Sequence, residues 1–457
     1  MKKKIFEVCY AEIWGLREEK GQWLEGHDVK NTKWRKLSPS DPYYFFVPRE
    51  EVGLEEYQRF TGIQEIFPVS STGIVTARDH FVVDQDRKSL ESNIRTFLDK
   101  RNTDDYIKEF LRGILHRREA SDVENYAWRV SQARQQLREE KDWEQYFTKI
   151  LYRPFDQRWI YYHPAVVWRT RTEVMQHMLQ PNLGLVIMRQ VALDEDYTHF
   201  LATDTLIDNR LFFSAKGITL QIPLYLYTDT QTTEKKKNPG VTVMMLFDKP
   251  KEGYKVKRPN INLELNALLN DTYNPQPVTT PLKKQKAFDV PPEEIFYYIY
   301  AVLYSNTYRQ KYQEFLKIDF LRVPFTKDYQ LFQKLGKLGE QLVGLHLLKS
   351  KDLAKPIAKF QGKDSNMVEK REYEKGRVYI NDEQYFEGIK PEVWEYQIGG
   401  YQVLDKWLKD RKGRALSSED IKHYCKVVTA LTKTIKLQEK IDKLYPNVER
   451  SLVGTRH

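Results

Sequence analysis

Two periods of apolar residues divide the chain. In residues 1–85 and 151–230, short apolar stretches with an alternating pattern predict strands, because successive side chains of a strand point to opposite faces. In residues 86–150 and 292–350, apolar residues recur at three- and four-residue spacing, which is typical of amphipathic helices. The pattern therefore predicts an α+β fold of mixed β-sheets of short strands, with helical spacer and scaffold elements.

The individual elements follow from this pattern and from residues that start helices. The predicted strands are 5–14, 43–50, 73–84, 157–163, 183–190, 199–203 and 222–227. The predicted helices are 90–101, 104–115, 123–140, 143–151, 170–179, 293–316, 329–350 and 417–445. Ser121, with Glu124 three residues later, predicts a helix start, and so does Ser417 or Ser418. Residues 367–381 predict a β hairpin, and the stretch IGGYQVL predicts a glycine-rich turn.

Four segments follow from the order of these elements. They are a β-rich segment at 1–85, a helical spacer at 86–150, an α/β core at 151–290, and a helical scaffold at 291–457 that includes the hairpin and the C-terminal helix. Polar stretches rich in lysine and proline, such as TQTTEKKKNPG and KPKEGYKVKRPN, interrupt the pattern between residues 230 and 290.

Composition limits the class of protein. The 457 residues carry a net charge of +10, with 29 Tyr, 22 Phe and 9 Trp, and a basic, aromatic-rich chain suits a polyanionic partner such as nucleic acid. Cys9 and Cys425 are the only cysteines, which supports neither a disulfide framework nor a zinc site. No apolar run reaches the length of a membrane span. We therefore expect a cytoplasmic protein with no membrane contact and no metal.

Motifs of common active sites are missing from the sequence. It contains no GxxxxGK[ST] phosphate loop, no GxGxxG, no HExxH and no GxSxG. Asp84 with Asp86, and the run from Asp194 to Asp196, offer carboxylates for a metal, but a solvated acidic turn is the favoured interpretation of each. The sequence therefore favours a binding role over catalysis by this chain alone.

Several long stretches resemble a known family. They include WRKLSPSDPYYFFVP, GIVTARDHFVV, YRPFDQRWIYYH, RTRTEVMQHML, NLGLVIMRQ, IPLYLY, LGEQLVGLHLL, GRVYIN and WEYQIGGYQVLDKWLKDRKGRALSSEDIKHY. In this order they are similar to the C-terminal target-recognition region of Type ISP restriction–modification enzymes and related large adenine-specific DNA methyltransferases. The similarity covers roughly residues 10–445.

The resemblance implies DNA recognition for restriction–modification or phage defence. In that family, a nuclease, a translocase and an adenine methyltransferase precede this region, and the motifs of these activities are not present here. We therefore expect no cofactor on this chain, with S-adenosylmethionine bound only by a methyltransferase partner or missing region. The expected partners are double-stranded DNA and a methyltransferase or restriction subunit.

Candidate DNA contacts combine cations with amide and carboxylate side chains, because phosphate contacts position a protein and base-edge contacts specify sequence. One group begins the helix at 170–179, one closes the strand at 183–190, one flanks LFFS, and one lies in the lysine-rich stretches. The residues are Arg169, Arg171, Thr172, Arg189, Gln190, Asp208, Asn209, Arg210, Lys216, Lys235, Lys236, Lys237, Lys255, Lys257 and Arg258. Ordinary solvated turns remain the alternative for each group.

For a second set of polar residues we expect a structural role or a place at a cleft. Asp156 is expected to form an ion pair with Arg153 or Arg158 across a tight turn. Thr76, Arg78 and Asp79 either line a cleft toward the missing methyltransferase or close a strand.

Two other functions remain open from the sequence. The chain could serve as a protein-assembly module of the same complex, or as a metal-dependent nuclease using Asp194, Glu195 and Asp196.

Overall fold

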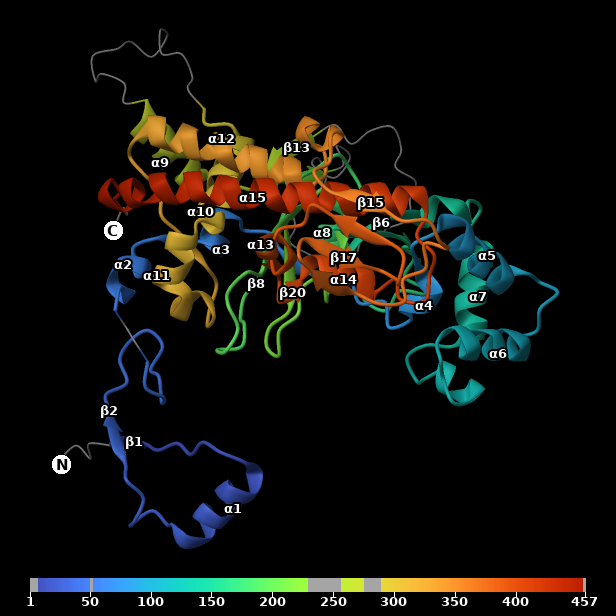
Figure 1. Cartoon of the computed structure of the whole chain (residues 1–457), viewed down its shortest axis with the longest axis horizontal. Coiled ribbons are helices and arrows are strands. Elements are labelled where there is room, and N and C mark those ends of the chain that lie inside the picture. Colours follow the sequence, from blue (N-terminus) through green and yellow to red (C-terminus); the bar gives the residue numbers. More distant parts are fainter. Residues whose placement is uncertain (1–6, 50–51, 229–255, 275–288, 455–457) are drawn as a thin grey trace, which may run out of the picture. The chain divides into compact units, whose positions relative to one another are not determined.

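The computed structural model describes residues 7–49, 52–228, 256–274 and 289–454 (Figure 1). The chain divides into two compact units, residues 1–54 and residues 55–457. This boundary falls inside the segment 1–85 that the sequence groups together. The predicted α+β class is confirmed, since helices and several small sheets are present.

The described residues of the first unit form one helix and one strand pair, and α2 (Leu54–Gln58) begins at its last residue, Leu54. β1 (Val8–Tyr10) pairs antiparallel with β2 (Arg35–Leu37), and α1 (Arg17–Gly26) lies between them in sequence. The predicted strand at 5–14 is thus confirmed at residues 8–10 and wrong at residues 11–14, while residues 5 and 6 lie outside the described residues. The predicted strand at 43–50 is wrong, because residues 43–49 form turns and bends. Aromatic residues favour strands locally, but no second strand pairs with this stretch.

The second unit holds the remaining elements. Its helices are α2 (Leu54–Gln58), α3 (Ile63–Ile66), α4 (Asp79–Val82), α5 (Arg87–Leu98), α6 (Asp104–Ile114), α7 (Val130–Glu139), α8 (Thr172–Met178), α9 (Leu263–Tyr273), α10 (Pro292–Tyr304), α11 (Asn306–Leu316), α12 (Tyr329–His346), α13 (Pro391–Trp394), α14 (Val403–Lys409) and α15 (Ser418–Arg450), with short 3-10 turns η1 (Ala120–Val123), η2 (Trp143–Tyr146) and η5 (Lys351–Ala354). Among the described residues, no helix is both long and apolar enough to cross a bilayer.

The strands of this unit are short. They are β3 (Thr61–Gly62), β4 (Ser71–Thr72), β5 (Val83–Asp84), β6 (Phe147–Arg153), β7 (Asp156–Tyr161), β8 (Gly184–Met188), β9 (Phe200–Thr203), β10 (Leu206–Ile207), β11 (Thr219–Pro223), β12 (Tyr225–Thr228), β13 (Val256–Pro259), β14 (Arg322–Val323), β15 (Lys359–Gln361), β16 (Glu372–Glu374), β17 (Arg377–Tyr379), β18 (Tyr385–Glu387), β19 (Gln397–Ile398) and β20 (Tyr401–Gln402).

Three sequence predictions in the first half of this unit are wrong. The stretch 73–84 is not one strand, because it contains two isolated bridges, α4 and β5. Residues 143–151 form η2 and β6 instead of a helix. Ser121 does not start the predicted helix, since it lies inside η1, and α7 begins only at Val130. In the first two cases pairing with distant residues overrides the local apolar spacing.

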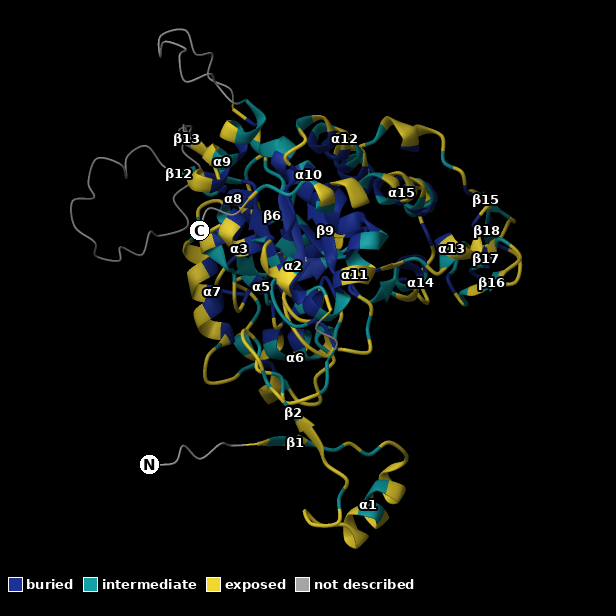
Figure 2. Ribbon diagram, turned by 90° about the vertical axis from the view of Figure 1, so that its left-hand side faces the viewer, coloured by how far each residue is buried: buried dark blue, intermediate teal, exposed yellow. Residues whose placement is uncertain are grey.

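Two sheets form the centre of the second unit. One has the order β10-β6-β7-β5. The other, which we call the β8 sheet, has the order β4-β11-β8-β9. β8 runs antiparallel to both neighbours, with Ile187 paired to Phe200 of β9 and Met188 paired to Thr219 of β11. All residues of β8 are buried, and Figure 2 shows the buried residues concentrated around β6, β9 and α10.

A helical scaffold supports the β8 sheet. Gly339 of α12 allows close approach to α10, because an added Cβ would lie 1.8 Å from the carbonyl oxygen of Tyr297. The hydroxyls of Tyr300 and Thr434 each hydrogen-bond one ring nitrogen of His346, at 2.6 and 2.9 Å. Burial lowers the pKa of His346 to about 3, so its ring is neutral. The Tyr300 hydroxyl also accepts from the amide of Ala202 in β9 at 3.0 Å, which ties the sheet edge to α10.

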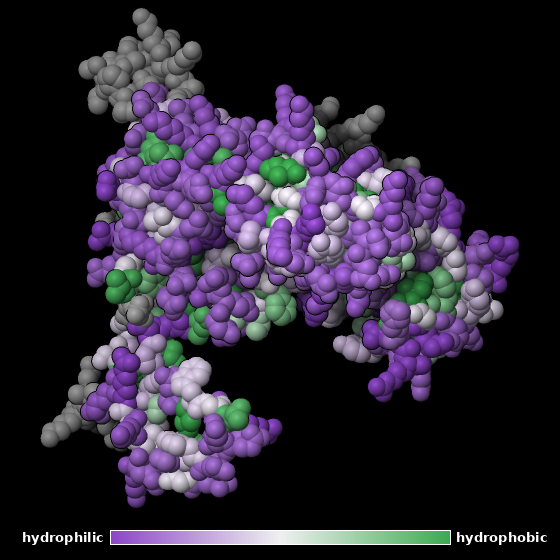
Figure 3. All heavy atoms as spheres, in the orientation of Figure 1, coloured by the Kyte–Doolittle hydropathy of each residue, from purple (hydrophilic) through white to green (hydrophobic). Residues whose placement is uncertain are grey.

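The C-terminal helix α15 begins where the sequence predicts. The Ser417 side chain accepts from the amide of Asp420 at 3.1 Å, as a capping residue does. The predicted hairpin at 367–381 is β16 and β17, which belong to a sheet of order β15-β18-β17-β16. Figure 3 shows that the face carrying α15 is mostly hydrophilic.

A buried ion cluster joins β7 to the residues that follow α14. The Asp156 carboxylate accepts from Arg158 at 2.7 Å and from Arg411 at 2.9 Å, and the side chains of Asp156 and Arg411 are 2% and 5% exposed. The predicted pairing of Asp156 with Arg158 is confirmed. Burial alone would raise the pKa of Asp156, but the two guanidinium groups outweigh it and lower this pKa to about 2.

Removing one member of this cluster should be costly. We expect Arg411→Met to lower the free energy of unfolding by about 3–5 kcal/mol, because it leaves the Asp156 charge buried with one cation fewer. Urea denaturation followed by circular dichroism measures this change. The control is Arg414→Met, since Arg414 is 43% exposed and lies 3.9 Å from Asp420, and it should cost less than about 1 kcal/mol. Equal losses in the two variants would contradict the structural role of the cluster.

Candidate nucleic-acid interface

Three chain segments meet at one end of the β8 sheet. β8 ends at Met188, β9 begins at Phe200 and β11 begins at Thr219, and their antiparallel pairing places these residues at the same end. β4 also ends there, because Thr72 pairs with Leu220 of β11. We call this the loop end. It carries the first loop (residues 189–199), the second loop (residues 208–218) and the segment 73–79 (Figure 1).

The segment after β4 brings two groups of predicted DNA contacts together. The amide of Val75 donates to the carbonyl of Arg169 at 3.1 Å, and the amide of Arg169 donates back at 2.9 Å. On the other side, the amide of Asn209 donates to the carbonyl of Ile74 at 3.0 Å. Gly73 permits this approach, because an added Cβ would lie 2.6 Å from the Asn209 nitrogen. Arg169 and the start of the second loop therefore flank one short segment.

The two loops are fastened to each other. The amide of Ala192 donates to the Ser214 hydroxyl at 2.9 Å, and the amide of Ala215 donates to the Glu195 carboxylate at 3.4 Å. Gly217 has φ +80°, and an added Cβ would lie 2.1 Å from the carbonyl oxygen of Gln190. The loop end is therefore an ordered surface.

The glycine turn, Gly399–Gly400, locks the loops from the other side. The amide of Gly399 donates to the carbonyl of Thr198 in the first loop at 2.9 Å. Its carbonyl accepts from the amide of Phe213 in the second loop at 2.7 Å. Both glycines have positive φ, +60° and +75°, which favours glycine. The stretch IGGYQVL predicts a turn, but the sequence alone does not show which residues this turn contacts.

Three exposed cations lie at the loop end besides Arg189. They are Arg169, Arg210 and Lys216, and among the described residues none of them has an ion-pair partner within 4 Å. The Arg169 guanidinium lies 4.5 Å above the ring of Trp168, whose side chain is 57% exposed. Such a stacked guanidinium keeps its donors free for phosphate or base edges.

Arg171 and Thr172 lie at the start of α8, as predicted. Arg171 is half-buried with φ +53°, and it precedes the first helical residue. The hydroxyls of Thr172 and Thr170 lie 3.0 Å apart. The helix spans only seven residues, so its dipole is small. Arg171 and Thr172 therefore mainly determine the turn that follows Arg169.

Arg189 and Gln190 lie at the loop end but are partly engaged. The Arg189 guanidinium pairs with Asp319 at 3.2 Å, and the Gln190 amide donates to the carbonyl of Ile318 at 3.1 Å. The Arg189 and Asp319 side chains are 53% and 39% exposed, so the pair is weak and can open for a ligand.

Asp208 lies below the loop surface. β6 and β10 are parallel, so Arg153 at the end of β6 meets Asp208 just after β10, and the two pair at 2.9 Å. Of the two alternatives predicted for Asp156, the ion pair with Arg158 forms, and Arg153 pairs with Asp208 instead. Burial raises the pKa of Asp208 to about 6, against the opposite effect of Arg153, and Asp79 adds to the rise. The Asp208 carboxylate thus orders the loop start and leaves Arg210 outside.

Thr76, Arg78 and Asp79 form a buried corner beside this pair. The Thr76 hydroxyl and the Tyr152 hydroxyl both donate to the Asp79 carboxylate, the latter at 2.9 Å. The Arg78 guanidinium lies 3.7 Å above the ring of Trp128. Burial, with a smaller effect of Arg117, lowers the pKa of Arg78 to about 10.

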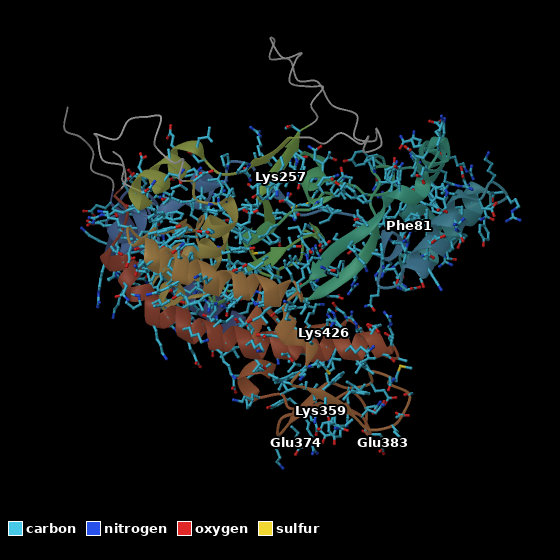
Figure 4. All side chains as sticks on the ribbon, turned by 90° about the horizontal axis from the view of Figure 1, so that it is seen from above. Phe81, Lys257, Lys359, Glu374, Glu383 and Lys426 are labelled. Atoms are coloured by element: carbon cyan, nitrogen blue, oxygen red, sulfur yellow. The ribbon has the colours of Figure 1, made fainter. Side chains whose placement is uncertain are left out.

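The remaining predicted contacts lie elsewhere. Lys257 and Arg258 are on β13, which pairs with β12 beyond the opposite end of the β8 sheet, and Lys257 lies 3.5 Å above the ring of Tyr225 (Figure 4). Lys235–Lys237 and Lys255 lie outside the described residues. Within the described residues, no group of three or more His, Cys, Asp or Glu side chains is placed to hold a metal ion.

Comparison with known proteins identifies the family. Residues 65–440 match the Type ISP C-terminal specificity domain. The chain belongs to this family. The family resemblance seen in the sequence is confirmed. A search of curated proteins gives no match.

Solved structures share the fold of this specificity domain. A nuclease-deletion mutant of the Type ISP restriction-modification enzyme LlaGI, in complex with a DNA substrate mimic, is 18% identical with a TM-score of 0.60, and the match covers 96% of this chain and 39% of that chain. The ATP-dependent Type ISP enzyme LlaBIII bound to DNA is 18% identical with a TM-score of 0.62, covering 89% and 25%. A DrdV–DNA complex is 19% identical with a TM-score of 0.66, covering 93% and 42%. This specificity domain therefore spans less than half of each of these chains.

Gly399→Ala should disturb the loop end. An added Cβ would lie 2.0 Å from the ring of buried Phe212, and Gly399 already has positive φ. We expect a loss of about 2–4 kcal/mol in unfolding free energy, from the backbone conformation and the overlap together.

Gly413→Ala is the matched control, measured in the same urea titration. Gly413 has φ +76°, but nothing lies within 4 Å of an added Cβ, so only the backbone cost of about 1 kcal/mol remains. Equal losses would show that the glycine turn does not need the space at residue 399.

The raised pKa of Asp208 predicts a pH dependence. A carboxyl with a higher pKa in the folded state favours folding below its unfolded pKa, and this contribution is lost as pH rises through about 6. The difference in unfolding free energy between Asp208→Asn and wild type should therefore move in favour of the variant between pH 4 and pH 7. The expected change is about 2–3 kcal/mol, measured by urea denaturation at each pH. A difference that stays constant across this range would contradict the raised pKa of Asp208.

Proposed function

We propose that this specificity domain reads a particular double-stranded DNA sequence through the loop end of the β8 sheet. The observation that supports this most is the antiparallel register of β4, β11, β8 and β9, which gathers separate predicted contact groups at one end. Membership in a specificity-domain family supports the same reading.

The exposed residues of the loop end suit the two kinds of DNA contact. Arg169, Arg210 and Lys216 carry charge without a described ion-pair partner, which suits phosphates, and a guanidinium also suits the O6 and N7 acceptors of guanine. Asn209 is half-exposed on the same loop, and an amide suits adenine. Lys257 and Arg258, at the opposite end, would add phosphate contacts only if DNA extends across the sheet.

Catalysis is proposed to lie outside this chain. The three similar chains are more than twice as long as the matched region. In the proposed arrangement, a methyltransferase partner or missing region binds S-adenosylmethionine and methylates adenine N6. A base must leave the helical stack for such chemistry, so the reader and the catalytic region would share one DNA site. This specificity domain would bind neither metal nor cofactor.

Selection of duplexes from a randomised pool tests the proposal. At about 150 mM salt, phosphate-only binding is weakened, and we expect a short enriched sequence. The Arg169→Ala and Arg210→Ala variants should each bind this sequence about 5- to 100-fold more weakly, the range for loss of a charged base or phosphate contact.

Arg377→Ala is the matched control for this experiment. Arg377 lies on β17 with its guanidinium 4.8 Å above the ring of Tyr385, as Arg169 lies above Trp168. It should leave affinity and selected sequence unchanged. An equal effect of all three substitutions would point to general charge. No DNA binding at low salt would favour a protein-assembly role, and magnesium-dependent cleavage by the chain alone would favour a nuclease.

A further inference from the structure

Phe213 combines a fixed backbone with an exposed ring. Its amide donates to the carbonyl of Gly399 at 2.7 Å, and its carbonyl accepts from Nε2 of His199 at 2.8 Å. Gly400 leaves room for that carbonyl, since an added Cβ would lie 2.2 Å from it. The side chain of Phe213 is nevertheless 57% exposed. Both backbone polar groups are satisfied inside the fold while the ring is held outside it.

The neighbouring phenylalanine is buried, so two successive rings of the second loop differ in exposure. Phe212 is 2% exposed and fills the space that Gly399 leaves. The Phe212 ring therefore anchors the second loop in the core, and the Phe213 ring faces solvent. At 57% exposure the Phe213 ring forgoes part of the about 1.5–3 kcal/mol that full burial contributes, and the hydrogen-bonded backbone holds it where a ligand can reach it.

The surroundings of Phe213 indicate the chemistry of that ligand. Arg210 and Lys216 lie three residues to either side on the same loop, both exposed. Tyr401 is the ring that lies near it, with centroids 6.1 Å apart. An apolar ring between two cations suits a partner with an anionic backbone and flat apolar faces, which is the combination that nucleic-acid bases and phosphates provide.

We propose that Phe213 inserts between stacked bases at the recognised DNA site. A phenylalanine has no hydrogen-bonding group, so its contact with a base is stacking or wedging, as apolar side chains do in DNA-distorting proteins. The fixed backbone lowers the entropy lost on insertion. This inference rests on the proposed function and adds that the reader unstacks the duplex through a residue of its own, without the catalytic region.

Fluorescence of 2-aminopurine tests the insertion. The base is placed in turn at each adenine of the selected sequence, where it is quenched by stacking. Saturating wild-type protein should raise the fluorescence at one step of the site, and Phe213→Ala at saturation should not. Phe213→Ala should also bind about 5- to 150-fold more weakly, which corresponds to about 1–3 kcal/mol for one stacked base. Phe213→Trp should keep both affinity and signal.

Tyr106→Ala is the matched control, because Tyr106 is 54% exposed and lies on α6, away from the loop end. It should behave as wild type. A selected sequence bound by wild type with no fluorescence rise at any position would overturn the insertion and leave the proposed function standing. So would a Phe213→Ala variant with wild-type affinity and signal. Failure of the wild-type chain to select any sequence would overturn the proposed function, and the insertion with it. The wild-type fluorescence measurement does not depend on the variant folding.

Discussion

Backbone pairing of β8 with β9 on one side and β11 on the other decides where the variable parts of this specificity domain lie. The two antiparallel ladders require that the chain leave β8 and enter both neighbours at the same end. The first and second loops must therefore emerge together, whatever their sequences. All of β8 is buried, so a register shift of one residue would misplace side chains that are close-packed on both faces. A fixed scaffold with freely variable loops is what a sequence reader requires.

The first and second loops are ordered mainly by backbone hydrogen bonds, which place few constraints on their side chains. Backbone groups of Thr198, Gly399 and Phe213 form one continuous chain of hydrogen bonds, which leaves the side chains of Arg210 and Lys216 available. Buried charges perform the equivalent task beneath the surface, where Asp208 holds Arg153 and Asp156 holds Arg411. These pairs are expensive to break because a lone buried charge is unsatisfied. Contacts in the interior thus fix the position of the two loops, and their exposed side chains remain free to determine what is bound.

Prediction from the sequence succeeded where the local pattern coincides with the tertiary environment. β7, β8, β9, α8, α12 and α15 lie at or close to their predicted ranges, since their apolar periodicity matches a buried face. It failed at 143–151, where a helical spacing lies on β6, and at 73–84, where pairing with Arg169 and Asn209 replaces a continuous strand. The partner of Arg153 and the role of Gly399 depend on strands that are adjacent only in the folded chain. No spacing within the sequence encodes these contacts.

Hydrogen–deuterium exchange of the whole chain, with and without its selected duplex, tests the central claim most directly. The account predicts that DNA slows amide exchange in the first loop, the second loop and the residues around Arg169, and that a scrambled duplex of equal length slows it much less. Slower exchange confined to β12 and β13, or to the hairpin sheet of β15–β18, with unchanged loops, would contradict the assignment of the loop end as the DNA-reading surface.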